Sequence, residues 1–125
     1  MSKKEYNKYL GKEDNLQKSV ALYLDSLGLI WFHPPNEIKA KPQYYKKRKA
    51  LGVKSGVPDI MVLNHSKYYT GLAIELKVGK NKPTDNQLKW LEDLKSIGYY
   101  TLVSYSLEEV IDIIDGYIKD EELPK

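Results

Sequence analysis

The 125-residue chain contains no cysteine. This absence excludes a disulfide framework, Cys-ligated zinc, an iron–sulfur cluster and a cysteine nucleophile. Apolar runs are also short, and none approaches the roughly 18 residues that a transmembrane helix requires. The amino-terminal segment Met-Ser-Lys-Lys-Glu-Tyr-Asn-Lys-Tyr includes no apolar stretch of the kind that secretory signals carry. We therefore expect a cytoplasmic protein with no membrane partner.

Arginine is scarce as well, because Arg48 is its one occurrence in the chain. Arginine commonly reads guanine through paired hydrogen bonds, so recognition of a base sequence is poorly provided for. Lysine is abundant instead, and it is concentrated in residues 39–54, which we term the basic segment. This segment holds no acidic residue and contains Lys39, Lys41, Lys46, Lys47, Arg48, Lys49 and Lys54. Its charge indicates an anionic partner, with nucleic acid first, whereas a solvated lysine-rich loop is the alternative.

Length and residue patterning predict one α/β domain with a mixed central β-sheet flanked by helices. The expected order of elements is α-β-β-β-α-β-α. We expect the domain to cover residues 12–120, after a flexible arm at residues 1–11 and before a polar tail at residues 121–125. The expected strands cover residues 29–33, 59–63, 69–78 and 99–105.

Helices are predicted by apolar residues at helical spacing and by residues that favour helix ends. One helix is expected at residues 12–27, and another after the capping-box sequence that begins at Thr84. A last helix follows a second capping box at Ser106. Residues 36–56 form a long connection, in which residues 44–51 are expected to form a short helix. Connections of this length are usually functional or mobile.

Three charged residues interrupt two strands that otherwise read as buried. Asp59 opens one strand after Pro58, and Glu75 and Lys77 lie in the next strand. Burying unpaired charge costs several kcal/mol, so this placement favours a functional role. Alternation puts Glu75 and Lys77 on one face of their strand. Antiparallel pairing of the two strands would bring Asp59 beside Glu75.

These residue types suit metal-dependent hydrolysis of a phosphodiester. Mg²⁺ prefers oxygen ligands and keeps several waters, so two carboxylates and one backbone carbonyl suffice to hold it. The cation supplies Lewis acidity and an activated water. A neighbouring lysine stabilises the developing charge, or orients and deprotonates the water once its own pKa is lowered. The sequence therefore predicts a nuclease centre that uses Mg²⁺ or Mn²⁺.

Two polar residues lie on the apolar sides of predicted helices. At about 100° per residue, Glu13 lies close to Val20 around the axis of the first helix. Gln87 lies between Leu91 and Leu94 around the axis of the later helix. Glu13 has an alternative role as an N-terminal acid favoured by the helix dipole, and the capping box alone can explain Gln87. Spacing shows only that both residues can converge with the three charged residues.

Other residues keep two interpretations at the level of sequence. Tyr44 and Tyr45 lie among lysines, and their rings either stack on bases or sugars or pack the connection onto the body of the domain. His33 has either a role at a metal or phosphate or a structural role at the end of a strand.

Pro58-Asp59 followed by Glu75-Leu76-Lys77 resembles the signature of the PD-(D/E)xK nucleases, and the expected order of elements is similar to their core. Within that superfamily the chain resembles a stand-alone VRR-NUC domain, over nearly its whole length after residue 12. The resemblance is carried by Glu13 with Gln17, His33-Pro34-Pro35-Asn36, residues 49–60, residues 71–77, residues 87–94 and Gly98-Tyr99. The chain departs from many relatives at Glu37, which follows Asn36 where they carry glycine. A shared role of Asn36 is therefore open.

The resemblance implies a restriction-endonuclease-like fold and assigns roles to individual residues. The carboxylates of Asp59 and Glu75 and the carbonyl of Leu76 would hold the metal, with Glu13 at or near it. Lys77 would be catalytic, and the Gln87 amide would organise this lysine or a phosphate. The residues implied to bind DNA are Gln17, Lys46, Lys47, Arg48, Lys49 and Lys54.

The resemblance also implies a function, namely a metal-dependent endonuclease that acts as a homodimer on branched DNA such as a four-way (Holliday) junction. A two-fold axis would let two active sites cut two strands symmetrically. A phage or mobile-element setting is implied by analogy. Two alternatives stay open. One is a non-catalytic or weakly nicking DNA-binding domain that keeps the fold, and the other is a small-molecule or protein interaction domain with an accidental motif.

Overall fold

The computed structural model describes the backbone of residues 3–35 and 42–125 and the side chains of residues 12–35 and 44–125. This part of the chain forms four helices and four strands. In chain order they are α1 (Lys3–Ser26), β1 (Trp31–Phe32), α2 (Pro42–Ala50), β2 (Ile60–Val62), β3 (Gly71–Leu76), α3 (Asp85–Ser96), β4 (Tyr99–Ser104) and α4 (Leu107–Ile118). The predicted order is confirmed, and α2 lies inside the predicted long connection. None of the helices so described is long and apolar enough to cross a membrane.

The strands form one mixed sheet in the order β1-β2-β3-β4. β1 pairs with β2 and β2 pairs with β3 in the antiparallel sense, whereas β3 and β4 run parallel. A parallel pair needs a crossover connection, and α3 provides it between these two strands. Every residue of β3 is buried, as expected for a central strand with helices on both faces. The predicted α/β class with a mixed sheet is therefore confirmed.

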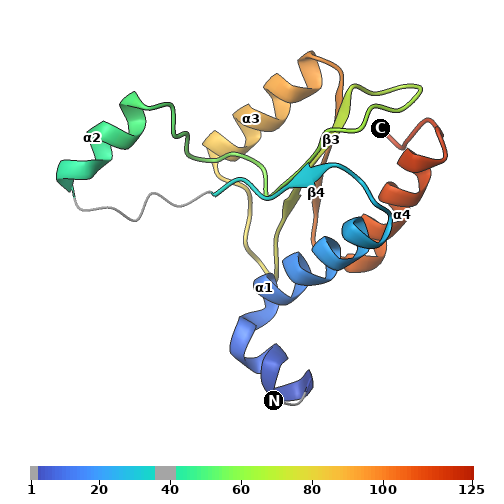
Figure 1. Cartoon of the computed structure of the whole chain (residues 1–125), viewed down its shortest axis with the longest axis horizontal. Helices are drawn as coiled ribbons and strands as arrows, with labels where there is room; N and C mark the ends of the chain where they lie inside the picture. Colours follow the sequence, from blue (N-terminus) through green and yellow to red (C-terminus); the bar gives the residue numbers. More distant parts are fainter. Residues whose placement is uncertain (1–2, 36–41) are drawn as a thin grey trace.

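Helices cover both faces of the sheet (Figure 1). α1 and α4 contribute Leu24 and Tyr117 to the main apolar core, which includes Ile74 of β3. α3 contributes Leu91 to a smaller core on the other face, where it meets Ala73. Successive residues of a strand point to opposite faces, so the side chains of β3 alternate between the two cores. The residue two positions after Ala73 therefore faces α3.

The elements differ from the predicted ones mainly at their ends. α1 begins at Lys3, well before the predicted start at residue 12. Lysine and glutamate are good helix formers, so a helix can extend through this lysine-rich segment. β1 is shorter than predicted, because the N–H of Ile30 donates to the side chain of Asn64 and Pro34 has no N–H to donate. β3 ends at Leu76, so the predicted catalytic lysine lies just beyond the strand.

The capping box predicted at the start of α3 is confirmed. Thr84 Oγ1 accepts a hydrogen bond from the N–H of Gln87, and the Gln87 side chain accepts one from the N–H of Thr84. At the start of α4, Ser106 Oγ accepts from the N–H of Glu109, but the N–H of Ser106 donates to Ser104 Oγ. The first turn of α3 is therefore held by two hydrogen bonds between Thr84 and Gln87.

Two leucines test how α1 packs on the sheet. Leu24 is fully buried, whereas Leu22 on the same helix is 61% exposed. Leu24→Ala should lower the free energy of unfolding by about 2–5 kcal/mol, because it leaves a cavity in the core. Leu22→Ala should change it by less than about 0.5 kcal/mol. Urea denaturation followed by circular dichroism measures both variants, and equal effects would contradict the observed packing of α1.

Candidate metal centre

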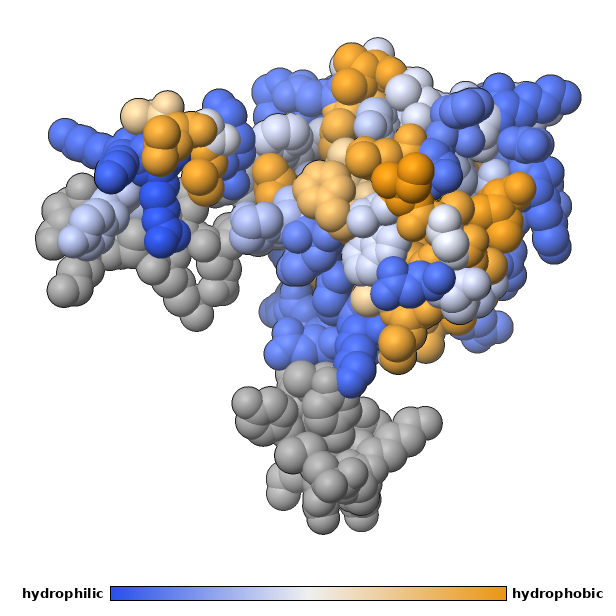
Figure 2. All heavy atoms as spheres, viewed as in Figure 1, coloured by the Kyte–Doolittle hydropathy of each residue, from blue (hydrophilic) through white to orange (hydrophobic). Residues whose placement is uncertain are grey.

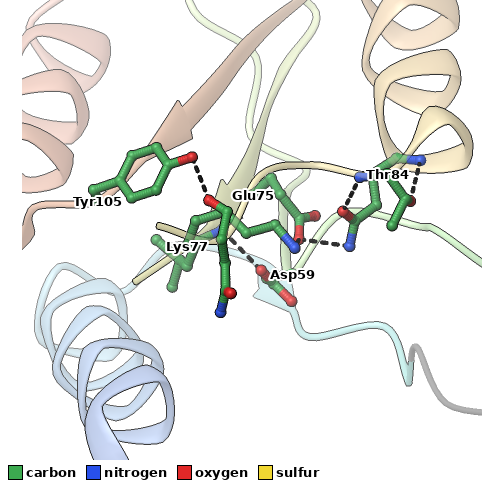
Figure 3. A network of polar contacts seen from close by, with 8 residues as sticks. Asp59, Glu75, Lys77, Thr84 and Tyr105 are labelled. Atoms are coloured by element: carbon green, nitrogen blue, oxygen red, sulfur yellow. Dashed lines mark hydrogen bonds and ion pairs between the residues drawn. The ribbon is translucent and has the colours of Figure 1, made fainter. Parts of the chain in front are cut away.

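Two carboxyl groups meet where β2 begins and β3 ends (Figure 3). Ile60 pairs with Ile74, and the same antiparallel register continued by one residue puts Asp59 opposite Glu75. The two carboxyl groups interact directly. Asp59 Oδ2 also accepts a hydrogen bond of 2.8 Å from the backbone N–H of Leu76. The neighbourhood of Asp59 and Glu75 expected from strand pairing is therefore present in the fold.

Glu75 is almost completely buried, with 1% of its surface exposed. Burial, followed by the charge and hydrogen bonding of Asp59, raises the pKa of Glu75 from 4.5 to about 8, although Lys77 acts in the opposite direction. The lysine therefore does not neutralise the carboxyl pair fully. A further cation between the two carboxylates would stabilise their charged forms.

Lys77 and Gln87 both contact the same oxygen of Glu75. Nζ of Lys77 lies 3.5 Å from Glu75 Oε1, and Nε2 of Gln87 donates to that oxygen at 3.0 Å. Oε1 of Gln87 accepts from the N–H of Thr84 at 2.8 Å. One amide thus closes the capping box and holds Glu75, so both roles considered for Gln87 are possible together. Because both donors use Oε1, neither of them occupies Oε2 of Glu75.

The segment that leads into Asp59 lies against the first turn of α3. Gly56 has a φ of 77°, and a Cβ there would lie only 2.7 Å from Cβ of Asn86 and 2.9 Å from its carbonyl carbon. The amide of Asn86 donates to Ser55 Oγ at 3.2 Å, and the indole N–H of Trp90 donates to the carbonyl of Ser55 at 3.1 Å. The close approach and the positive φ both require glycine at position 56.

His33 contacts the backbone of Asp59. Its Nδ1 lies 2.5 Å from the carbonyl oxygen of Asp59. A carbonyl only accepts, so Nδ1 carries a proton and Nε2 is the acceptor nitrogen of the neutral ring. This contact gives His33 a structural role, and a role at a metal or phosphate stays a prediction. Asn36 and Glu37 lie outside the described residues.

The first helix approaches the sheet from the side away from α3. Glu13 is exposed and Gln17 is half-buried on α1, which packs on the face opposite to α3. Among the described side chains, no three His, Cys, Asp or Glu residues gather into a metal-binding group. Glu13 therefore does not join Asp59 and Glu75 in such a group. The metal role of Glu13 and the DNA role of Gln17 stay predictions.

The predicted DNA-binding lysines and arginine lie on α2 and just after it, and all are exposed: Lys46, Lys47, Arg48, Lys49 and Lys54. Lys39 and Lys41 lie outside the described residues. The side chains of α2 and of the segment that follows it form a largely hydrophilic surface with a small apolar patch (Figure 2). The predicted site residues do not include Trp90, whose indole N–H donates to the carbonyl of Ser55. An indole N–H needs a partner when it is partly buried, and this requirement was the available signal.

The oxygen donors present fit a divalent cation of the Mg²⁺ or Mn²⁺ kind. Asp59 and Glu75 offer carboxylates, and the backbone carbonyl of Leu76 follows directly on the strand. Hard cations prefer such oxygen ligands, and Mg²⁺ completes its shell with water. Burial is the main cause of the raised pKa of Glu75 and the charge of Asp59 adds to it, so a bound cation would favour the ionised form of Glu75.

Comparison with known proteins agrees with the fold. The family model of the VRR-NUC domain matches residues 31–106. A solved structure described as a VRR_NUC domain protein is 28% identical, covers 90% of this chain and 92% of its own, and superposes with a TM-score of 0.73. No curated protein matches the chain.

These matches imply a nuclease of the PD-(D/E)xK type, a class that typically uses a divalent metal. Because the family model covers more than half of its residues, the chain belongs to the VRR-NUC family.

The raised pKa of Glu75 makes the stability of the metal-free protein depend on pH. Glu75 ionises near pH 8 in the folded protein and near 4.5 as an ordinary carboxyl group. The folded state holds the proton of Glu75 more tightly than the unfolded state does. The stability that this proton contributes is therefore complete below about pH 4.5 and is lost as the pH rises through about 8. A pKa difference of one unit between the folded and unfolded states corresponds to about 1.4 kcal/mol. The free energy of unfolding should therefore fall by an amount on the order of several kcal/mol.

Urea unfolding across this pH range measures the effect in the presence of EDTA. Glu75→Gln should flatten the decline, because the amide does not ionise. Mg²⁺ or Mn²⁺ should stabilise the original protein most at the upper end of the range, where no proton has to be displaced. An identical pH dependence in the original protein and in Glu75→Gln would contradict the prediction.

Gly56→Ala should destabilise the protein more than Gly52→Ala does. Both glycines have positive φ, so a Cβ adds left-handed backbone strain of about 1–2 kcal/mol at either position. A Cβ at Gly52 meets nothing within 4 Å, whereas one at Gly56 overlaps Asn86. The overlap should cost about 1–3 kcal/mol more, measured by urea denaturation. Equal losses in the two variants would show that the approach to Asn86 is not tight.

Proposed function

We propose that the protein is a divalent-metal-dependent endonuclease that acts on branched DNA. The observation that carries the proposal is the network of Asp59, Glu75, Lys77 and Gln87 at the end of a buried central strand. Membership of the VRR-NUC family supports nuclease chemistry. Phosphodiester hydrolysis needs a positioned water and compensation for the charge that grows on the phosphoryl group.

Each residue of the network has its own task in this proposal. Asp59 and Glu75 hold the cation together with the carbonyl of Leu76. When bound, the cation supplies Lewis acidity to the phosphoryl oxygen and lowers the pKa of water. The ammonium of Lys77 lies 3.5 Å from Glu75, where it can stabilise negative charge on a phosphate at the centre. Gln87 is a positioning residue, because the cap of α3 fixes its amide and the amide holds Glu75.

The DNA-binding surface in this proposal is α2 with the segment that follows it. Its basic side chains are exposed, and no acidic residue lies between residues 42 and 54. Lysine contacts to phosphate hold DNA without reading its sequence, which supports selection by DNA shape. Two copies related by a two-fold axis would present two centres to a junction, so we propose a homodimer as the active form.

The purified protein should cleave branched DNA with Mg²⁺ or Mn²⁺ and should be inactive in EDTA. Asp59→Asn removes a metal ligand and Lys77→Met removes the stabilising charge. Each should lower the cleavage rate by at least about 100-fold. Denaturing gels of a four-way junction, a flap, a nicked duplex and a linear duplex measure the rates, and light scattering measures the oligomeric state.

Lys80→Met is the matched control, because Lys80 is exposed in the loop after β3 and should keep the original rate. Urea denaturation shows whether each variant is folded. Glu13→Gln is assayed in parallel, and an unchanged rate would remove Glu13 from the centre. If no DNA is cleaved with either metal, the enzyme proposal is lost. Equal cleavage of linear and branched DNA would refute the proposed shape selection, and a monomer would refute the homodimer.

A further inference from the structure

A cleft of roughly 220 Å³ lies between α2 and α3. Residues from both helices and from the connecting segment line it, among them Tyr45, Lys49, Lys54, Ser55, Asn86 and Trp90. Sites for drug-sized ligands are about 300–1,000 Å³. The cleft is smaller and suits a single base or sugar.

The cleft combines positive charge with aromatic surface, and none of the described side chains that line it is acidic. Lys49 and Lys54 are exposed at its edge. A third lysine, Lys89, has its ammonium 2.6 Å from the carboxylate of Asp93, so the first two supply most of the uncompensated charge. Tyr45 is 46% exposed, so its ring is not consumed by packing against the body of the domain.

The wall on α3 is already fixed without a ligand. The indole N–H of Trp90 donates to the carbonyl of Ser55 at 3.1 Å, and the amide of Asn86 donates to Ser55 Oγ at 3.2 Å. These two bonds join α3 to the segment that carries Lys54. Proteins bind single-stranded nucleic acid by stacking bases on aromatic rings and by placing lysines along the backbone. The cleft has both components.

The cleft and the carboxylate centre share the first turn of α3. Asn86 lines the cleft, and the next residue, Gln87, donates to Glu75. Consecutive Cα atoms lie about 3.8 Å apart. A DNA strand with one phosphate at the centre can therefore reach the cleft within a few nucleotides.

We propose that this cleft binds one nucleotide of the DNA strand that is cut, with its base against Tyr45 and Trp90 and its phosphate on Lys49 and Lys54. The proposal rests on the proposed nuclease function and adds a site that holds the strand in register with the metal centre. It gives Tyr45 a stacking role. It also assigns Lys49 and Lys54 to one particular phosphate, whereas the other basic residues of α2 contact DNA outside the cleft.

Fluorescence anisotropy with a short single-stranded oligodeoxynucleotide tests the cleft directly. The titration is done in EDTA, so that binding is measured without cleavage. Stacking on one aromatic ring contributes about 1–3 kcal/mol per base, and about 1.4 kcal/mol is a tenfold change in Kd. Tyr45→Ala should therefore weaken binding by about fivefold to 140-fold, whereas Tyr45→Phe should bind like the original protein.

Tyr44→Ala is the matched control, because Tyr44 is the neighbouring exposed tyrosine of α2 and does not line the cleft. It should keep the original Kd. An abasic oligonucleotide of the same length separates stacking from charge, because it keeps the phosphates and lacks the bases. Tyr45→Ala should not weaken binding of the abasic strand, whereas Lys49→Gln with Lys54→Gln should weaken binding of both strands.

A spectroscopic measurement reports on Trp90 itself. The chain has two tryptophans and eleven tyrosines, so Trp90 is the single tryptophan in a Trp31→Phe background and is excited at wavelengths that tyrosine does not absorb. Its fluorescence should be quenched by the oligonucleotide and not by inorganic phosphate.

Equal affinities of Tyr45→Ala and Tyr44→Ala would overturn the cleft proposal, as would equal losses on the abasic strand or unquenched Trp90 during binding. None of these results would affect metal-dependent cleavage, which tests the nuclease function separately. A protein that binds with the predicted Tyr45 dependence but cleaves no DNA would refute the nuclease function and support the cleft as a nucleotide site. A protein that binds no DNA would overturn both proposals.

Discussion

The burial of Glu75 beside Asp59 is the interaction on which the rest of the structure depends. Two carboxyl groups in contact, one of them 1% exposed, destabilise a fold unless other groups hold them. The register of β2 on β3 brings them together, Lys77 and Gln87 hold Glu75, and the N–H of Leu76 holds Asp59. All of these groups belong to strand ends, to the residue just beyond a strand or to a capped helix turn, so the centre is built on rigid elements.

Gln87 links the integrity of α3 to the geometry of the centre. Its backbone N–H and its side-chain oxygen complete the capping box with Thr84, and its side-chain nitrogen reaches Glu75. The same turn meets Gly56, which leads towards Asp59. The start of α3 therefore positions both carboxylates, one through an amide and the other through backbone contact. Replacing Gln87 should therefore lower the stability of α3 as well as change the position of Glu75.

The central features of the fold followed from local patterns in the sequence. Alternation and strand pairing were enough to predict that Asp59 lies beside Glu75. Helical spacing was enough to predict that Gln87 faces the core side of its helix. The contact of His33 with the backbone of Asp59 was not predictable, because it joins segments that are distant in sequence and depends on the course of the backbone. Helical spacing gives the angle of Glu13 around α1 but not the face of the sheet that α1 covers, so it could not place Glu13 relative to the carboxylates.

The parallel pairing of β3 and β4 should delay completion of the centre during folding. β2 and β3 can pair as a hairpin across a short loop, but β4 must wait until α3 has crossed the sheet. Pairings between distant segments form slowly. Gln87 lies on the crossover helix, so Asp59 and Glu75 can come together before the Gln87 amide is in place to hold Glu75. A truncated chain that ends before α3 would carry both acids without the amide that holds Glu75.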